Sequence, residues 1–217
     1  MLDQVLNSLQ PTETRLVAVS KTKPNEQIVE MYDRGQRIFG ENRVQEVTDK
    51  HAALPKDIEW HFIGHLQTNK VKYIAPFISL IHSVDSLKIL KEINKQAKRN
   101  ERIIDGLLQF HIAEEDTKYG LDLAEAQALL ASDAYAEMEN IRLVGVMGMA
   151  TFTDDKAQVR REFQQLQQIF STLKKNHFAE ADAFKEISMG MSGDYLIAME
   201  EGSTLVRIGS LLFGSRH

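Results

Sequence analysis

Residues 16–24 read Leu-Val-Ala-Val-Ser-Lys-Thr-Lys-Pro and decide the fold that we expect for this chain of 217 residues. Four consecutive apolar residues, two of them β-branched, predict a short strand buried on both faces, as in parallel sheets. Pro24 suits the first turn of a helix, because the N–H that proline lacks would have no partner there. Lys21 then lies where strand turns to loop, at the edge where barrels and open α/β sheets carry their chemistry.

Lys21 has two interpretations at that edge. A partly desolvated lysine amine can form a Schiff base with a carbonyl compound. An ordinary loop lysine keeps its ammonium group in water, and residues 16–24 alone favour this second interpretation. The choice therefore depends on the rest of the chain.

The remaining sequence predicts eight strands that alternate with helices, the longest helix over 155–176. The expected strands are 16–20, 37–40, 58–64, 80–84, 106–113, 142–149, 186–190 and 205–209. Such alternation predicts parallel βαβ units. Because closure removes exposed sheet edges, this chain length favours a single (β/α)₈ TIM barrel over a doubly wound sheet. We expect one domain over residues 1–217.

Three helix starts carry capping signals. Asp122 and Glu125 have the spacing of a capping box, and Asp154 and Asp155 precede the long helix. Ser192 is placed as the N-cap of a helix over 192–201. A further helix is expected over 67–75.

Composition argues against several classes of protein. A net charge of −5 does not suit a nucleic-acid binder, and the absence of cysteine excludes a disulfide scaffold or a thiol nucleophile. The longest apolar run, 143–152, is too short to span a bilayer. No leader pattern opens the chain, so we expect a cytoplasmic protein without a nucleic-acid or membrane partner. We also expect a monomer.

Two late stretches place hydroxyls and glycines at strand ends. Residues 188–194 read Ser-Met-Gly-Met-Ser-Gly-Asp, and residues 207–214 read Arg-Ile-Gly-Ser-Leu-Leu-Phe-Gly. Ser192, and later Gly209 with Ser210, present a hydroxyl and bare backbone where a helix begins, which suits an anion. Arg207 lies two residues before Gly209 and so on the same strand face. The alternatives are that Ser192 only caps its helix and that Arg207 belongs to a buried ion pair.

Barrel closure would bring these pieces together. Strand eight would pair with strand one, so Lys21 would neighbour residues 190–193 and 207–210. Phosphate sites of TIM barrels recur at the loops after strands seven and eight. A Schiff-base lysine, a phosphate cup and a cation together describe a pocket for pyridoxal 5′-phosphate (PLP).

Five motifs in the same order carry a family resemblance. They are Val-Ser-Lys-Thr-Lys-Pro (19–24), Phe-Gly-Glu-Asn-Arg-Val-Gln-Glu (39–46), Trp-His-Phe-Ile-Gly-His-Leu-Gln-Thr-Asn-Lys (60–70), Ser-Met-Gly-Met-Ser (188–192) and Val-Arg-Ile-Gly-Ser (206–210). With these motifs the chain resembles the YggS/PROSC family of PLP homeostasis proteins. It departs from that family in a shorter N-terminal helix, since only about ten residues precede Pro11.

The resemblance implies a barrel similar to the N-terminal domain of alanine racemase. It implies that Lys21 is the PLP lysine and that Arg207 lies near the pyridine nitrogen. It further implies phosphate contacts from Ser192, Gly209 and Ser210, and a pocket-lining role for Asn42. By residue chemistry alone, Asn42 could equally satisfy its own loop.

The function implied is a PLP carrier that holds the cofactor as a lysine aldimine, with apo PLP-dependent enzymes as possible acceptors. An arginine at the ring nitrogen disfavours its protonation and hence carbanion chemistry. The chain ends eight residues after Gly209, so we expect no second domain to supply another acid–base group. We therefore expect no catalytic residue and no robust turnover. A weak racemase with Lys21 as sole base, and a cofactor-free aldolase-like barrel, remain alternatives.

The histidines do not indicate a metal site. His61 and His65 lie four apart, but Gly64 ends a strand between them, so the helical spacing of two ligands does not apply. We expect both at the barrel mouth or in the core, and His82 and His111 as satisfied interior groups.

Overall fold

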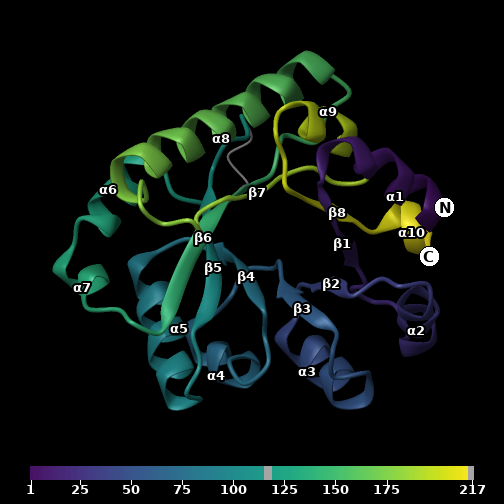
Figure 1. Ribbon diagram of the computed structural model, residues 1–217, viewed down its shortest axis with the longest axis horizontal. Helices are drawn as coiled ribbons and strands as arrows, with labels where there is room; N and C mark the ends of the chain where they lie inside the picture. Colours follow the sequence, from purple (N-terminus) through teal and green to yellow (C-terminus); the bar gives the residue numbers. More distant parts are fainter. Residues whose placement is uncertain (115–118, 215–217) are drawn as a thin grey trace.

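The computed structural model describes residues 1–114 and 119–214 and contains a closed barrel of parallel strands (Figure 1). The strands are β1 (Arg15–Val19), β2 (Ile38–Glu41), β3 (Glu59–Phe62), β4 (Leu80–Val84), β5 (Ile104–Phe110), β6 (Ile141–Gly148), β7 (Glu186–Ser188) and β8 (Leu205–Ile208). They follow one another around the barrel in chain order, and β8 pairs with β1. The predicted (β/α)₈ barrel is confirmed.

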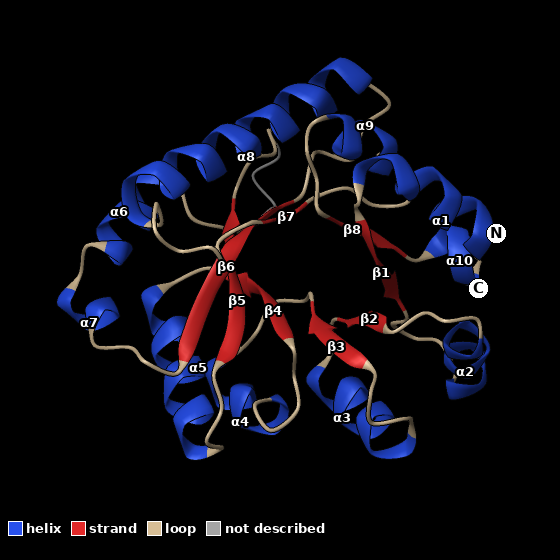
Figure 2. Cartoon of the chain, viewed as in Figure 1, coloured by secondary structure: helices blue, strands red, loops and turns tan. Residues whose placement is uncertain are grey.

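Helices surround the barrel as an outer layer (Figure 2). They are α1 (Leu2–Leu9), α2 (Asn25–Asp33), α3 (Val44–Ala53), α4 (Val71–Ile74), α5 (Leu87–Arg99), α6 (Leu123–Leu130), α7 (Asp133–Ala136), α8 (Lys156–His177), α9 (Tyr195–Glu200) and α10 (Ser210–Phe213), with 3-10 turns η1 (Gln10–Thr12) and η2 (Thr68–Lys70). The helix expected over 67–75 is instead η2 followed by α4, since Thr68 and Asn69 are weak helix formers and Pro76 ends the element. Among the helices of the described residues, none is long and apolar enough to cross a bilayer.

Two of the predicted caps are confirmed. Asp122 and Glu125 form the reciprocal capping box at the start of α6, and Asp155 accepts hydrogen bonds from the first turn of α8. The prediction for Ser192 was wrong, because α9 begins at Tyr195 with Asp194 in the N-cap position. Asp194 instead accepts a hydrogen bond from the N–H of Met191 (2.5 Å), which closes a turn before the helix can begin. Ser192 lies in this turn.

Alternation along the strands separates an outer core from an interior core. The outer core contains residues from both strands and helices, so it fills the space between the barrel and its surrounding layer. The interior core contains only strand residues and therefore faces the barrel axis: Val17, Leu80, Leu107, Val144, Met147 and Leu205. Inward-facing positions beyond this apolar layer are the ones that can line a site at the carboxyl ends of the strands.

A register shift in β6 adjusts which of its residues face inward. Between Gly106 and Leu107 of β5, the partner in β6 advances from Leu143 to Gly145, which leaves Val144 as an extra residue. A Cβ atom on Gly145 would lie 1.8 Å from the Glu186 carbonyl oxygen of β7. Glycine is therefore required here by the close approach of two strands.

Candidate functional site

Lys21 is the second residue after β1 and lies in a tight turn at the carboxyl edge of the barrel. The turn is closed by a hydrogen bond from the Lys23 N–H to the Ser20 carbonyl oxygen (3.0 Å). Val17 faces the barrel axis, and Lys21 lies four residues further along, just beyond the last strand residue, Val19. Its side chain is half-buried and has an interaction partner within the structure.

Two contacts hold the Lys21 turn against the end of β8. The Lys23 Nζ donates hydrogen bonds to the carbonyl oxygens of Phe213 (2.9 Å) and Gly214 (3.3 Å). A Cβ on Gly209 would lie 3.2 Å from the Val19 carbonyl oxygen, so the absence of a side chain lets the two strand ends approach. Barrel closure thus places the β1 turn beside residues 209–214, which overlap the stretch 207–210 that the sequence predicts as its neighbour.

The loops after β7 and β8 are joined through a serine hydroxyl. Ser192 Oγ accepts a hydrogen bond from the Gly209 N–H (3.3 Å). A hydroxyl that accepts this bond still has its own hydrogen to donate. Ser210 begins α10 and is exposed. Two hydroxyls from different loops are therefore available near one rim of the barrel.

Asn42 lies after β2 and is fixed by the neighbouring strand end. A Cβ on Gly64, just after β3, would lie only 2.4 Å from the Asn42 carbonyl oxygen. Within the described residues, no hydrogen bond uses the Asn42 side-chain amide. Because the loop forms no hydrogen bond with this amide, the amide is available to a ligand.

Arg207 is a buried cation held by neutral acceptors. Only 4% of the residue is exposed, and its guanidinium donates to Ser188 Oγ (2.6 Å) and to the Gly148 carbonyl oxygen (3.1 Å). Burial lowers the pKa of Arg207 to about 10, partly opposed by the charge of Asp194, so the side chain stays charged at neutral pH. In the described part of the chain it forms no ion pair, which argues against the buried ion-pair alternative.

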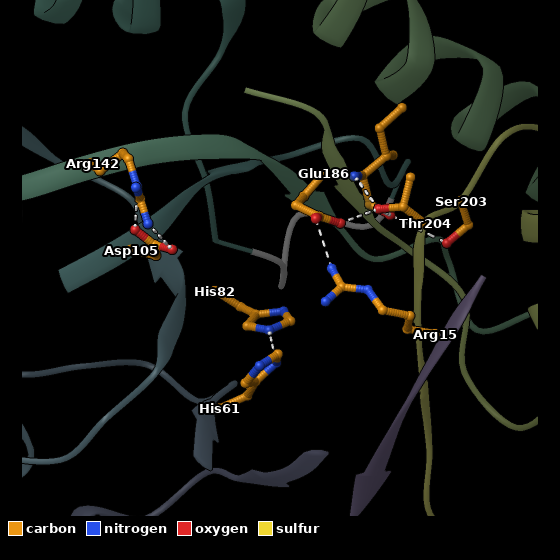
Figure 3. Close-up of polar contacts among 9 residues, drawn as sticks. Arg15, His61, His82, Asp105, Arg142, Glu186, Ser203 and Thr204 are labelled. Carbon is orange, nitrogen blue, oxygen red and sulfur yellow. Dashed lines mark hydrogen bonds and ion pairs between the residues drawn. The ribbon is translucent and has the colours of Figure 1, made fainter. Parts of the chain in front are cut away.

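A line of hydrogen bonds crosses the barrel interior beneath Arg207. Ser188 Oγ lies 2.9 Å from His82 Nδ1. His82 Nε2 lies 3.0 Å from His61 Nδ1, and Figure 3 shows this pair of rings. Desolvation lowers the pKa of His61 to about 3 and that of His82 well below its usual value. Both rings are therefore neutral at pH 7, so each has one donating and one accepting nitrogen. The groups that link Arg207 to this line of contacts are therefore all neutral.

The expected places of the histidines are largely confirmed. His61 and His82 are satisfied interior groups, whereas His65 has a side chain 57% exposed and lies 3.4 Å from an Asp85 oxygen. The prediction that His111 is an interior group was wrong, because His111 follows the end of β5 and is half-buried, although it has an interaction partner. Among the described residues no group of potential ligands is arranged to hold a metal ion.

Sequence reasoning missed several polar residues around the site. Ser188 was quoted only as part of a motif, although alternation on β7 places it inward. Lys23 received no role. Glu46, which is partly buried, and the buried Lys50 form an ion pair beside the Lys21 turn (2.7 Å), and their i,i+4 spacing was a signal that they interact.

The neutral histidines predict an acid-sensitive fold. In the unfolded chain His61 becomes protonated below about pH 6.5, whereas in the folded chain it stays neutral until about pH 3. The free energy of unfolding therefore falls as the pH falls across this range. From pH 7 to pH 5, His61 should cost about 2 kcal/mol of unfolding free energy. Urea titrations at several pH values should show that the free energy of unfolding depends less steeply on pH in His61→Gln than in the original chain. An unchanged slope in His61→Gln, with His65→Gln as the exposed control, would contradict the assignment.

Comparisons with known proteins agree with this architecture. A family model described as "Alanine racemase, N-terminal domain" matches residues 2–217. A pyridoxal phosphate homeostasis protein of Aquifex aeolicus is 40% identical over 203 residues, which cover 93% of this chain and 87% of the relative. The Homo sapiens protein of the same name is 40% identical over 222 residues, with coverage of 97% and 78%.

A solved structure extends the agreement to three dimensions. PipY of Synechococcus elongatus is 33% identical, and the match covers 99% of this chain and 100% of PipY. Its structures without PLP and with PLP bound give TM-scores of 0.89 and 0.86. The chain therefore belongs to the family of the alanine racemase N-terminal domain, together with the pyridoxal phosphate homeostasis proteins.

Proposed function

We propose that residues 1–217 act as one domain that binds PLP on Lys21 and carries the cofactor without turning over amino acids. One observation carries the proposal: the Lys21 turn, the hydroxyls of two loops and the buried Arg207 cation gather at one rim of the barrel. PLP has an aldehyde, a phosphate and a ring nitrogen, and each has a suitable partner here. The name of the 40% identical relatives and the PLP-bound PipY structure support this choice of ligand.

The residues present fit the cofactor by their chemistry. Ser192 and Ser210 would hold the phosphate through their hydroxyls, with the backbone of Gly209 between them. Arg207 would face the ring nitrogen, and Asn42 would line the pocket with an amide that its own loop does not use. When bound, PLP supplies an electrophilic aldehyde that a lysine can capture.

Lys21 would hold the cofactor covalently. Its amine would form a Schiff base with the aldehyde that PLP supplies, with loss of one water molecule. Arg207 keeps its positive charge at neutral pH, since its pKa is lowered only to about 10. A cation at the ring nitrogen opposes protonation there, and that weakens the electron sink that amino-acid turnover requires.

Carriage therefore fits the pocket better than catalysis. The homeostasis proteins among the relatives support this view. As expected from the sequence, we propose a cytoplasmic monomer whose acceptors are apo PLP-dependent enzymes.

Removal of the amine tests the covalent assignment. Borohydride reduction after incubation with PLP should add the mass of one reduced cofactor to the peptide that contains Lys21. Lys21→Ala should lose this adduct and keep the melting temperature within a few degrees, because a half-buried turn lysine contributes little packing. Lys56→Ala, an exposed lysine, is the control. An adduct of equal stoichiometry in Lys21→Ala would show that another residue holds the cofactor.

Removal of either hydroxyl tests the phosphate site. Ser192→Ala or Ser210→Ala should weaken PLP roughly ten- to a hundredfold, since each loses a hydrogen bond to an anion worth about 1.5–3 kcal/mol. Pyridoxal, which lacks the phosphate, should be weakened far less. Ser171→Ala, on the exposed face of α8, should leave both affinities unchanged. Equal losses for the two ligands would count against a phosphate role.

A further inference from the structure

The turn that carries Lys21 has an unfavourable backbone conformation. Thr22, the residue after Lys21, has a φ of 65°, in the left-handed region. A β-branched residue rarely adopts this conformation, and turns with positive φ at their third residue usually place glycine or asparagine there. A conformation of this kind persists only where surrounding contacts enforce it.

Two side chains of α3 form hydrogen bonds with the peptide groups on either side of Lys21. Glu46 Oε1 accepts a hydrogen bond from the Thr22 N–H (2.5 Å), immediately after Lys21. Lys50 Nζ donates to the Ser20 carbonyl oxygen (2.8 Å), immediately before it. Because Glu46 and Lys50 lie one helical turn apart and bind each other (2.7 Å), they act on the turn as one unit.

The anchor of this unit is a buried, fully used ammonium group. Lys50 is 5% exposed and donates to Ser20, Glu46 and Glu41 Oε1, the last at 2.7 Å. An ammonium has three donors, so Lys50 has none left for a ligand. Glu41 is fully buried and also accepts a hydrogen bond from Ser20 Oγ (2.6 Å). Such a network has little freedom to move, because a shift of any one of these side chains would break a buried hydrogen bond and leave a polar group without that partner.

The network lies behind the strand end, on the opposite face from the barrel interior. Ala18 and Phe39 belong to the outer core, so Ser20 and Glu41, two residues further along, also face the helices. Lys21 is the next residue along the chain. The contacts therefore fix the peptide groups on either side of Lys21.

We propose that Glu46 and Lys50 are positioning residues that hold the strained turn so that the Lys21 amine is presented to the aldehyde of PLP. This inference rests on the proposed function. An ion pair that only stabilised α3 would need neither backbone contact, whereas both contacts fall on the residues that flank Lys21. We call the contacts of Glu46 and Lys50 with the Thr22 N–H and the Ser20 carbonyl the clamp. Loss of the clamp should leave the barrel folded and leave Lys21 badly oriented.

A pair of substitutions at Glu46 separates geometry from charge. Glu46→Gln keeps an oxygen that accepts from the Thr22 N–H, whereas Glu46→Ala removes it. With PLP, borohydride trapping of the Lys21 peptide should give an adduct rate at least about tenfold lower in Glu46→Ala, and near the original rate in Glu46→Gln. Pyridoxal should be slowed by the same factor, since the aldehyde and not the phosphate is affected. Asp49→Ala, exposed on the same helix, is the control.

Lys50 needs a compensated variant, because Lys50→Met alone would leave two carboxylates without their cation. Glu41→Gln combined with Lys50→Met removes one charge of each sign and should slow the adduct as Glu46→Ala does. Hydrogen exchange at the Thr22 amide, measured without PLP, should be faster in Glu46→Ala than in Glu46→Gln. Melting temperatures show that each variant is folded.

The outcomes distinguish the clamp from the proposed function. Original adduct rates in Glu46→Ala and in the double variant would overturn the clamp and leave the proposed function intact. An original chain that forms no adduct at Lys21 would overturn the proposed function. In that case an unchanged rate of hydrogen exchange at the Thr22 amide in Glu46→Ala would overturn the clamp too. A faster rate of exchange in this variant would support the clamp.

Discussion

The pairing of β8 with β1 is the constraint on which the site depends. It sets Ala18 opposite Ile208 and brings the end of the first strand against the end of the last. Residues almost two hundred positions apart in the chain thereby become neighbours: Lys23 binds the carbonyl of Phe213, and Gly209 approaches Val19. An open sheet with the same strands would separate the Lys21 turn from the hydroxyl-bearing loops.

The second feature of the site is the buried positive charge of Arg207 inside the barrel. Burial of a guanidinium is costly unless its donors are satisfied, and Arg207 finds neutral acceptors in Ser188 and the Gly148 carbonyl. His82 and His61 extend the support as neutral rings. The interior therefore keeps a positive charge beside the loops that no ion pair of the described residues neutralises, although the charge of Asp194 acts on it. A buried cation of this kind favours an anionic ligand and disfavours protonation of a ring nitrogen placed next to it.

The sequence was sufficient for the fold and insufficient for the contacts that tune the site. Alternating buried strands and helix signals such as the Asp122–Glu125 capping box report local physics, and the structure reproduces them. Ser192 was assigned as a cap because its type fits, but Asp194 closes a turn through the N–H of Met191, which delays the helix. The Ser188–His82 contact joins β7 to β4 and depends on the barrel's cross-section, which no local pattern encodes.

The same limit applies around Lys21. Its position at a strand end follows from the sequence, whereas its backbone conformation depends on Glu46 and Lys50, which act from a different helix. The i,i+4 spacing of that pair indicates a helix-surface ion pair and does not indicate that it reaches the neighbouring turn.

Direct transfer of cofactor tests the central claim that this chain carries PLP. The chain loaded with PLP and freed of excess ligand should activate an apo PLP-dependent enzyme, while racemase, transaminase and lyase assays of the same sample show no robust turnover. Multiple turnovers on any amino acid, with no activation of the apo-enzyme, would contradict the account.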